Sequence, residues 1–346
     1  MTSPRVLATC TRGGVGDLLA ALPAINALQR RFDMPIDVLT TPYAAEILLG
    51  QPAIGEVLTD DGQEPLRALV ERLRSRAYTH AVVFWSDPRI AKAIQQAGIG
   101  VRVGQSRRLY SFRYTLRVNV RSETGDTQSH WTDIQMDYAR ALGAVATPDD
   151  FRIALHVTAE DERKADSLIA RAVGDRSFII FHAARGISAQ AQRWPSEHFA
   201  AVGDALAVAF GCPVVVTGSP KEAALAAATV AAMRQPAFDA SGATSLRSFA
   251  ALAQRAMLVV ALDSGPMHIA AIAGAPTVGI FALRTDLPSR WRPLGDHVAL
   301  VEPSFACPPR CRKETCKTFA CYAALDPRSV VNAARRVLQM DAAEAS

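Results

Sequence analysis

The chain has 346 residues, of which 49% are hydrophobic and 21% are charged, and its formal net charge is +5. This length suits two domains of roughly 150–170 residues, and the apolar share fills two cores, which excludes a disordered chain. No run reaches the ~20 consecutive apolar residues that a membrane span requires, and the first residues lack the pattern of a signal peptide. We therefore expect a soluble, cytoplasmic protein.

Short apolar β-runs alternate with amphipathic helices along the chain, which is typical of doubly wound parallel sheets. In the first series we expect strands at 6–9, 36–40 and 81–85, and helices at 18–32 and 132–142. In the second series we expect strands at 178–181, 213–217, 257–262 and 277–281. The domains are placed at 1–157 and 158–325, and the helical segment 326–346 is expected to return to the N-terminal domain.

The first predicted strand ends in a glycine-rich loop that reads Thr11-Arg12-Gly13-Gly14-Val15-Gly16-Asp17. Gly14 and Gly16 let the backbone run close to a ligand, but Leu19 stands where a dinucleotide fingerprint has its third glycine. This departure makes an NAD-dependent dehydrogenase a less favoured interpretation. Asp17 is a candidate general base at the helix start, and a first-turn charge explains an Asp there equally well.

Six arginines lie between positions 102 and 121, and the same stretch contains no Asp or Glu. Such a patch favours anionic partners, for example lipid phosphates or a phosphorylated glycolipid. No motif supports nucleic-acid binding. Arg107, Arg108 and Arg113 are candidate contacts for such a partner, although each is also explained as an ordinary surface charge.

Candidate phosphate-binding and nucleoside-binding residues follow the strands of the second series. Arg185 follows the strand at 178–181, and Gln192 and Arg193 precede the next helix. Both arginines suit phosphate, and both are also explained as surface charges. The strand at 213–217 ends in a turn where an acidic side chain can accept hydrogen bonds from a ribose. The candidates in that turn are Ser219, Lys221 and Glu222.

The most informative stretch reads Asp263-Ser264-Gly265-Pro266-Met267-His268-Ile269-Ala270-Ala271 and lies between two apolar β-runs. Ser264, Gly265 and Pro266 suit the start of a short helix, whose free N–H groups and dipole form an anion site. A diphosphate fits that site best, with Asp263 and His268 on either side. Alternatively, Ser-Gly-Pro only starts a core helix.

Four cysteines lie close together near the C-terminus with the spacing C-x3-C-x4-C-x4-C. In a reducing compartment, clustered thiols favour metal coordination over disulfides. Zinc is the first candidate and iron the second, in a local structural role. The four ligands are Cys307, Cys311, Cys316 and Cys321.

In their order along the chain, Gly-Gly-Val-Gly-Asp, Arg-Trp-Pro-x-Glu-His-Phe, Thr-Gly-Ser-Pro-x-Glu and the stretch 263–271 resemble glycosyltransferase family 9. This family includes the ADP-heptose:lipopolysaccharide heptosyltransferases. The resemblance spans nearly the whole chain. It implies a GT-B architecture, with two Rossmann-like α/β domains facing a cleft, the acceptor in the N-terminal domain and the nucleotide-sugar in the C-terminal one. It also implies an inverting transfer that needs no metal or other cofactor.

The resemblance also implies roles for individual residues. Asp17 matches the general base, and Glu222 matches the residue at the nucleoside. The diphosphate turn of the family matches Ser264, Gly265 and Pro266, flanked by Asp263 and His268. The family usually has Lys where this chain has Gln192. The resemblance leaves open whether Arg185, Arg193 or Lys221 compensates, whether the donor differs, or whether activity is weak.

The expected reaction moves a heptose or related sugar from an ADP-sugar to a lipopolysaccharide core or other glycan acceptor. The expected partners are the nucleotide-sugar and an anionic glycolipid, with peripheral contact at the inner membrane. Two alternatives stay open, a nucleotide-sugar epimerase of the same fold and a non-catalytic nucleotide-sugar-binding protein.

Overall fold

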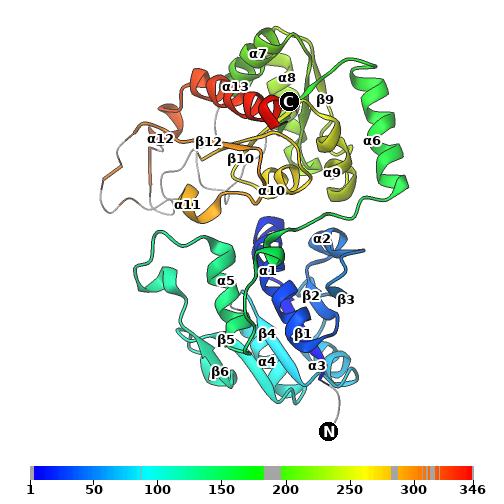
Figure 1. Cartoon of the computed structure of the whole chain (residues 1–346), viewed down its shortest axis with the longest axis vertical. Coiled ribbons are helices and arrows are strands. Elements are labelled where there is room, and N and C mark those ends of the chain that lie inside the picture. The colour runs from blue at the N-terminus through cyan, green and yellow to red at the C-terminus, as the bar shows by residue number, and fades with distance from the viewer. Residues whose placement is uncertain are drawn as a thin grey trace. The chain divides into compact units, whose positions relative to one another are not determined.

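The structure is a computed structural model that describes residues 4–85, 87–182, 196–281, 287–305, 307–308, 311, 316–318 and 320–344. The chain divides into two compact units, residues 1–156 and 157–346. Each unit contains one six-stranded parallel sheet with helices packed against it (Figure 1). Within the described residues, no helix is both long enough and apolar enough to cross a lipid bilayer.

The first unit has the strand order β3-β2-β1-β4-β5-β6. Its strands are β1 (Val6–Cys10), β2 (Ile36–Thr40), β3 (Ile54–Thr59), β4 (His80–Val83), β5 (Val101–Gln105) and β6 (Leu116–Val118). Its α-helices are α1 (Val15–Phe32), α2 (Pro42–Ala45), α3 (Leu66–Arg74), α4 (Pro88–Gln96) and α5 (Trp131–Arg140). Short 3-10 turns add η1 (Glu46–Leu48), η2 (Ser111–Arg113), η3 (Arg121–Thr124) and η4 (Pro148–Phe151).

The second unit has the strand order β12-β11-β10-β7-β8-β9. Its strands are β7 (Ile179–His182), β8 (Val214–Thr217), β9 (Ala237–Asp239), β10 (Leu258–Leu262), β11 (Thr277–Ile280) and β12 (Val298–Val301). Its helices are α6 (Ala159–Ala172), α7 (Ser196–Phe210), η5 (Pro220–Glu222), α8 (Ala223–Ala232), α9 (Leu246–Arg255), α10 (Gly265–Ile272), α11 (Pro288–Trp291), α12 (Ala320–Ala323) and α13 (Pro327–Glu344).

The two units share one topology. Counted from the first strand of each unit, both sheets have the order 3-2-1-4-5-6, which is the Rossmann order. The order reverses between β1 and β4 in the first sheet and between β7 and β10 in the second. Ligands of such sheets bind outside the carboxyl ends of the strands at this reversal. A ligand site is therefore expected at the loops after β1, β4, β7 and β10.

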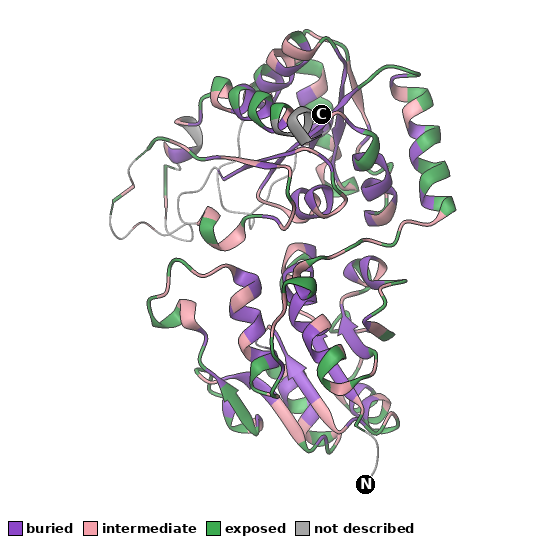
Figure 2. Cartoon of the chain, viewed as in Figure 1, coloured by how far each residue is buried: buried purple, intermediate pink, exposed green. Residues whose placement is uncertain are grey.

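Burial explains why the central strands read as continuous apolar runs. All residues of β1 and β10 are buried, and Figure 2 shows the same for most of both sheets. Parallel strands covered by helices on both faces carry apolar side chains on both faces too. The predicted strands of both series are confirmed, with ends that differ by one or two residues.

The last helix, α13, packs against α7, β11 and β12. Val330, Ala334 and Val337 on this helix are fully buried with the side chains of the second sheet. Its apolar side therefore belongs to the core of the second unit.

An ion pair between half-exposed Arg30 and buried Asp150 connects α1 to the segment that follows α5. The Asp150 carboxylate accepts hydrogen bonds from Arg30 Nε at 2.9 Å, from Arg30 Nη2 at 2.7 Å and from the Thr147 backbone N–H at 2.7 Å. Burial alone would raise the pKa of Asp150, but these donors outweigh burial and hold the pKa below its ordinary value. Folding therefore favours the ionised form.

We predict that Asp150→Asn lowers the free energy of unfolding by about 2 kcal/mol at neutral pH, because hydrogen bonds to a buried charge are lost. The contribution of Asp150 is complete above about pH 4 and disappears as the pH falls below that value. Urea unfolding from pH 3 to 7 measures both effects. Asp149→Asn is the matched control, because Asp149 is exposed and its ion pair is with exposed Arg152; an equal loss in both variants would contradict the prediction.

Candidate functional site

The loop after β1 places a carboxylate at the start of α1. Asp17 lies in the first turn of this helix and accepts a hydrogen bond from the Gly14 backbone N–H, at 2.6 Å from its Oδ2. Gly13 has φ +88°, and a Cβ on it would come within 2.5 Å of the Asp17 carboxylate. Only glycine therefore lets the loop fold this tightly over the carboxylate. The carboxylate is oriented by the backbone and remains partly exposed.

Asp87, which was not predicted from the sequence, follows β4 and contacts the loop after the neighbouring strand β1. It is 5% exposed. Its Oδ2 accepts a hydrogen bond from Thr11 Oγ1 at 3.0 Å and pairs with Arg12 Nε at 3.3 Å. Its Oδ1 accepts from the Arg89 N–H at 2.8 Å and thereby caps α4. The signal was present in the sequence, because Asp-Pro after an apolar strand is a helix cap.

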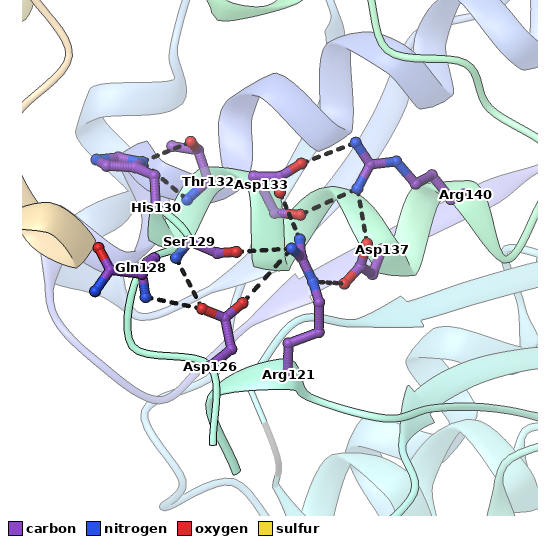
Figure 3. A network of polar contacts seen from close by, with 9 residues as sticks. All are labelled: Arg121, Asp126, Gln128, Ser129, His130, Thr132, Asp133, Asp137 and Arg140. Atoms are coloured by element: carbon purple, nitrogen blue, oxygen red, sulfur yellow. Dashed lines mark hydrogen bonds and ion pairs between the residues drawn. The ribbon is translucent and has the colours of Figure 1, made fainter. Parts of the chain in front are cut away.

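The segment between β6 and α5 is fixed by ion pairs (Figure 3). Arg121 Nε contacts Asp137 Oδ2 at 2.8 Å, and its Nη1 donates to Ser129 Oγ at 2.8 Å. Arg140 bridges the carboxylates of Asp133 and Asp137 at 2.8 and 2.7 Å. This network holds the start of α5 at the carboxyl edge of the first sheet. Networks with several partners are worth more than isolated surface pairs.

The start of α5 also carries a histidine cap. His130 Nδ1 accepts a hydrogen bond from the Thr132 backbone N–H at 3.2 Å, which puts the ring proton of the neutral form on Nε2. The next residue, Trp131, stacks at a tilt on Trp85 after β4, with ring centroids 5.3 Å apart. The loops after β4 and β6 are thus joined through aromatic packing.

The arginine-rich stretch does not form one uniform patch. Arg102 donates to backbone carbonyls, among them Arg113 O at 2.7 Å, and Arg121 belongs to the network described above. Arg108 pairs with Glu123. Arg113 donates to the side chain of Gln95, and its guanidinium lies over the Phe112 ring. Within the described part of the chain, the remaining two, Arg107 and Arg117, have no acidic partner.

In the second unit, the turn after β8 holds Glu222. Its Oε2 accepts a hydrogen bond from the Ser219 backbone N–H at 2.7 Å, which closes the turn that starts α8. A Cβ on Gly218 would come within 3.2 Å of Glu222, so a small residue is needed beside it. Lys221 lies next to Glu222 and is exposed. The structure thus brings Ser219, Lys221 and Glu222 together at the carboxyl end of β8.

The turn after β10 starts α10 as predicted, with the helix beginning at Gly265 and Pro266 as its second residue. Ser264 is the N-cap by backbone position, yet its Oγ is buried, caps nothing and has no hydrogen-bond partner among the described residues. A buried hydroxyl without a partner is costly and suits a position that a ligand completes. His268 Nε2 lies 4.0 Å from Asp263 Oδ1 on the same turn.

His182 ends β7 between these two turns. Its ring is buried, and Nδ1 lies 3.0 Å from Thr217 Oγ1. Burial lowers the pKa of His182 to about 4, against the smaller opposing effect of the Glu222 charge. The ring is therefore neutral at the centre of this edge. Sequence reasoning did not single it out, because nothing in the sequence shows how deeply the end of a strand is buried. Three other predicted donor residues, Arg185, Gln192 and Arg193, lie outside the described residues.

The clustered cysteines come together in part. Burial and interactions with the thiols of Cys307 and Cys316 raise the pKa of Cys311. Cys321 is buried against the core of the second unit. No set of three or more Cys, His, Asp or Glu side chains within the described residues is arranged to hold a metal ion. The interactions of the Cys311 thiol with those of Cys307 and Cys316 are the observation on which a metal site would depend.

The sequence matches the model of glycosyltransferase family 9 (heptosyltransferase) over residues 66–321. The chain therefore belongs to this family and is a glycosyltransferase. It is also similar to lipopolysaccharide heptosyltransferase 3 of Escherichia coli, with 26% identity over 297 residues that cover 82% of this chain and 83% of that protein.

Solved structures support the fold. E. coli ADP-heptose lps heptosyltransferase II is similar with a TM-score of 0.78 at 21% identity, over 97% of this chain and 99% of that one. The iron-containing dodecameric glycosyltransferase TibC from enterotoxigenic E. coli is similar with a TM-score of 0.58 at 15% identity, over 98% and 77%. The predicted GT-B class, with two Rossmann-like α/β domains, is confirmed.

We predict that the stability of the second unit depends on pH through His182. The unfolded chain protonates a histidine near pH 6.5, whereas the folded pKa is about 4, so the unfolded state binds more protons between these values. The free energy of unfolding should fall by up to about 3 kcal/mol as the pH drops from 6.5 to 4. Urea unfolding across this range should show a steeper fall for the wild type than for His182→Gln, and equal slopes would contradict the assignment.

Proposed function

We propose that this family 9 transferase moves a heptose or related sugar from an ADP-sugar to a lipopolysaccharide-core or other glycan acceptor, with Asp17 as the general base. The observation that carries the proposal is the Asp17 carboxylate, which is oriented by the Gly14 N–H and partly exposed at the carboxyl edge of the first sheet. In this proposal, residues 1–157 bind the acceptor and residues 158–325 bind the donor. The structural relative is an ADP-heptose lps heptosyltransferase, which supports the choice of donor.

The proposed reaction is a single displacement. Asp17 takes the proton of an acceptor hydroxyl while the hydroxyl oxygen forms a bond to the anomeric carbon of the donor sugar. The bond from that carbon to the diphosphate breaks on the opposite side, so the anomeric configuration inverts and ADP leaves with the electron pair. Asp17 ends protonated and returns its proton to water. No redox change and no cofactor take part.

The turn after β10 is the proposed diphosphate site. The first N–H groups of α10 have no partner within the helix, and they and the helix dipole favour the charge that develops on the leaving group. The buried Ser264 Oγ supplies one more donor. Asp263 and His268 flank the turn, and Gly265 and Pro266 let the phosphates approach its backbone.

Glu222 is the proposed nucleoside contact, with Ser219 beside it. The family lysine is replaced by Gln192, so we propose that Arg185, Arg193 and Lys221 neutralise the diphosphate. Preorganised cations near a diphosphate lower the cost of its departure because they need no rearrangement during the reaction.

The acceptor is proposed to bind along the loop after β1 and the arginine-rich connection after β5. Gly14 and Gly16 let the acceptor approach the backbone next to Asp17. The anionic groups of the acceptor contact Arg107, Arg108 and Arg113. Peripheral contact with the membrane that carries a glycolipid acceptor would follow from the same charges.

We predict that Asp17→Asn lowers kcat by about a hundred- to ten-thousand-fold, because the amide cannot accept the proton. The amide oxygen can still accept the Gly14 N–H bond, so the fold and the affinity for ADP should not change. Transfer from ADP-heptose to a lipopolysaccharide-core acceptor, followed by mass spectrometry of the product, measures the rate. Asp33→Asn, at the other end of α1, is the matched control, and a rate for Asp17→Asn equal to that of the control would exclude Asp17 as the base.

A structural zinc or iron ion at the cysteine cluster is part of the same proposal. Thiolates of Cys307, Cys311, Cys316 and Cys321 would hold it, and binding would displace the thiol protons. The interactions of the Cys311 thiol with Cys307 and Cys316 support the fit, and the iron-containing relative supports a metal in such a protein. The role is local stabilisation of the segment, without a part in the transfer.

We predict about one zinc or iron ion per chain in the purified protein, measured by inductively coupled plasma mass spectrometry. Cys311→Ser/Cys316→Ser should lose the metal, because two of four ligands are removed, whereas Cys10→Ser in the first unit should keep it. A wild-type protein without metal, prepared under reducing conditions without chelator, would contradict the site.

A further inference from the structure

The connection between β5 and β6 exposes two large apolar side chains at its tip. Leu109 is 99% exposed and Phe112 is 61% exposed. Burial of a side chain of this size contributes about 1.5–3 kcal/mol, and the exposed Leu109 and Phe112 side chains do not make this contribution. Both residues lie in the segment 107–113, here called the β5–β6 turn.

The β5–β6 turn is held rigid from inside. Ser111 Oγ is buried, donates to Gln105 O at 2.6 Å and accepts from the Arg108 backbone N–H at 3.0 Å. Tyr114 is 3% exposed, and its ring covers Gly104, where a Cβ would come within 2.3 Å of the ring. A polar serine thus points inward while a leucine and a phenylalanine point outward. This inversion of the usual pattern is fixed by packing and is not a consequence of a loose loop.

Cations lie beside the apolar side chains, and one of them, Arg108, pairs with Glu123. The Arg113 guanidinium carbon lies 4.8 Å from the centroid of the Phe112 ring, which keeps the charge beside the apolar side chain. Arg107, within the turn, and Arg117, on β6, are exposed and have no acidic partner among the described residues. Sequence positions 102–121 contain no Asp or Glu.

We propose that the β5–β6 turn docks on an anionic bilayer, with Leu109 and Phe112 entering the interface and the arginines contacting lipid phosphates. Two exposed apolar side chains with arginines in the same segment suit a bilayer, where a small apolar anchor and electrostatic attraction act together. Stable contacts between proteins bury about 1,200–2,000 Å² in total, more than this tip offers. The anchor goes beyond the proposed transfer reaction and does not depend on which sugar is moved.

The test is co-sedimentation with vesicles, using an equimolar mixture of phosphatidylcholine and phosphatidylglycerol and, separately, phosphatidylcholine alone. The wild type should bind the anionic vesicles more strongly, and part of this binding should persist in high salt because apolar contacts are not screened. Leu109→Ser/Phe112→Ser should weaken binding at least about tenfold at both salt concentrations. Arg107→Gln/Arg117→Gln should weaken binding in low salt only. Val145→Ser, which removes another exposed apolar side chain, is the matched control.

Three results would overturn the proposal. The serine double variant could bind as the wild type does, the wild type could leave the vesicles unbound, or its binding could vanish completely in high salt. Gel filtration tests the alternative that a second copy of the chain covers Leu109 and Phe112. A wild-type dimer that becomes a monomer in the serine double variant would show such an interface and would contradict the membrane proposal. Thermal unfolding with and without ADP separates this test from the transfer reaction, because the serine double variant should keep the wild-type response to ADP even where membrane binding is lost.

Discussion

The parallel strand order is the constraint on which the rest of this enzyme depends. In a parallel sheet, every loop that follows a strand lies at the same edge. In the 3-2-1-4-5-6 order, the loops after the two central strands run in opposite directions, which leaves space for a ligand between them. In the first unit Asp87 joins the loops at this reversal, by holding Thr11 and Arg12 and by capping α4. One buried carboxylate therefore positions the loop that carries Asp17.

In the second unit, two neutral side chains meet next to the reversal. His182 and Thr217 contact each other at the ends of β7 and β8. On the other side of the reversal, β10 ends in the turn that contains Ser264. This edge thus combines a neutral imidazole and the buried Ser264 hydroxyl with the charged side chains of Glu222 and Asp263. At the turn after β10, an anionic ligand would meet the free backbone N–H groups and the dipole of α10, which is the arrangement expected of a phosphate site.

The sequence predicted those features that depend on local patterns. Apolar runs between turn residues located the strands, and the Ser-Gly-Pro turn located the start of α10, because both signals are contained in a few neighbouring residues. Asp87 and His182 were not found as site residues, since their importance arises from burial and from partners far along the chain. The arginine stretch was predicted as one patch, but Arg102 and Arg121 are used for internal contacts that only the fold creates.

Thermal unfolding against ADP, UDP, GDP, CMP and NADH tests the central claim most directly. A ligand at about a hundred times its dissociation constant adds roughly 2.7 kcal/mol to the free energy of unfolding, which a shift in Tm reveals. The account predicts a shift with ADP that exceeds those of the other nucleotides and that is reduced in Glu222→Gln. A preference for UDP or GDP would contradict the ADP-sugar donor, and a shift with NADH alone would contradict the nucleotide-sugar site as a whole.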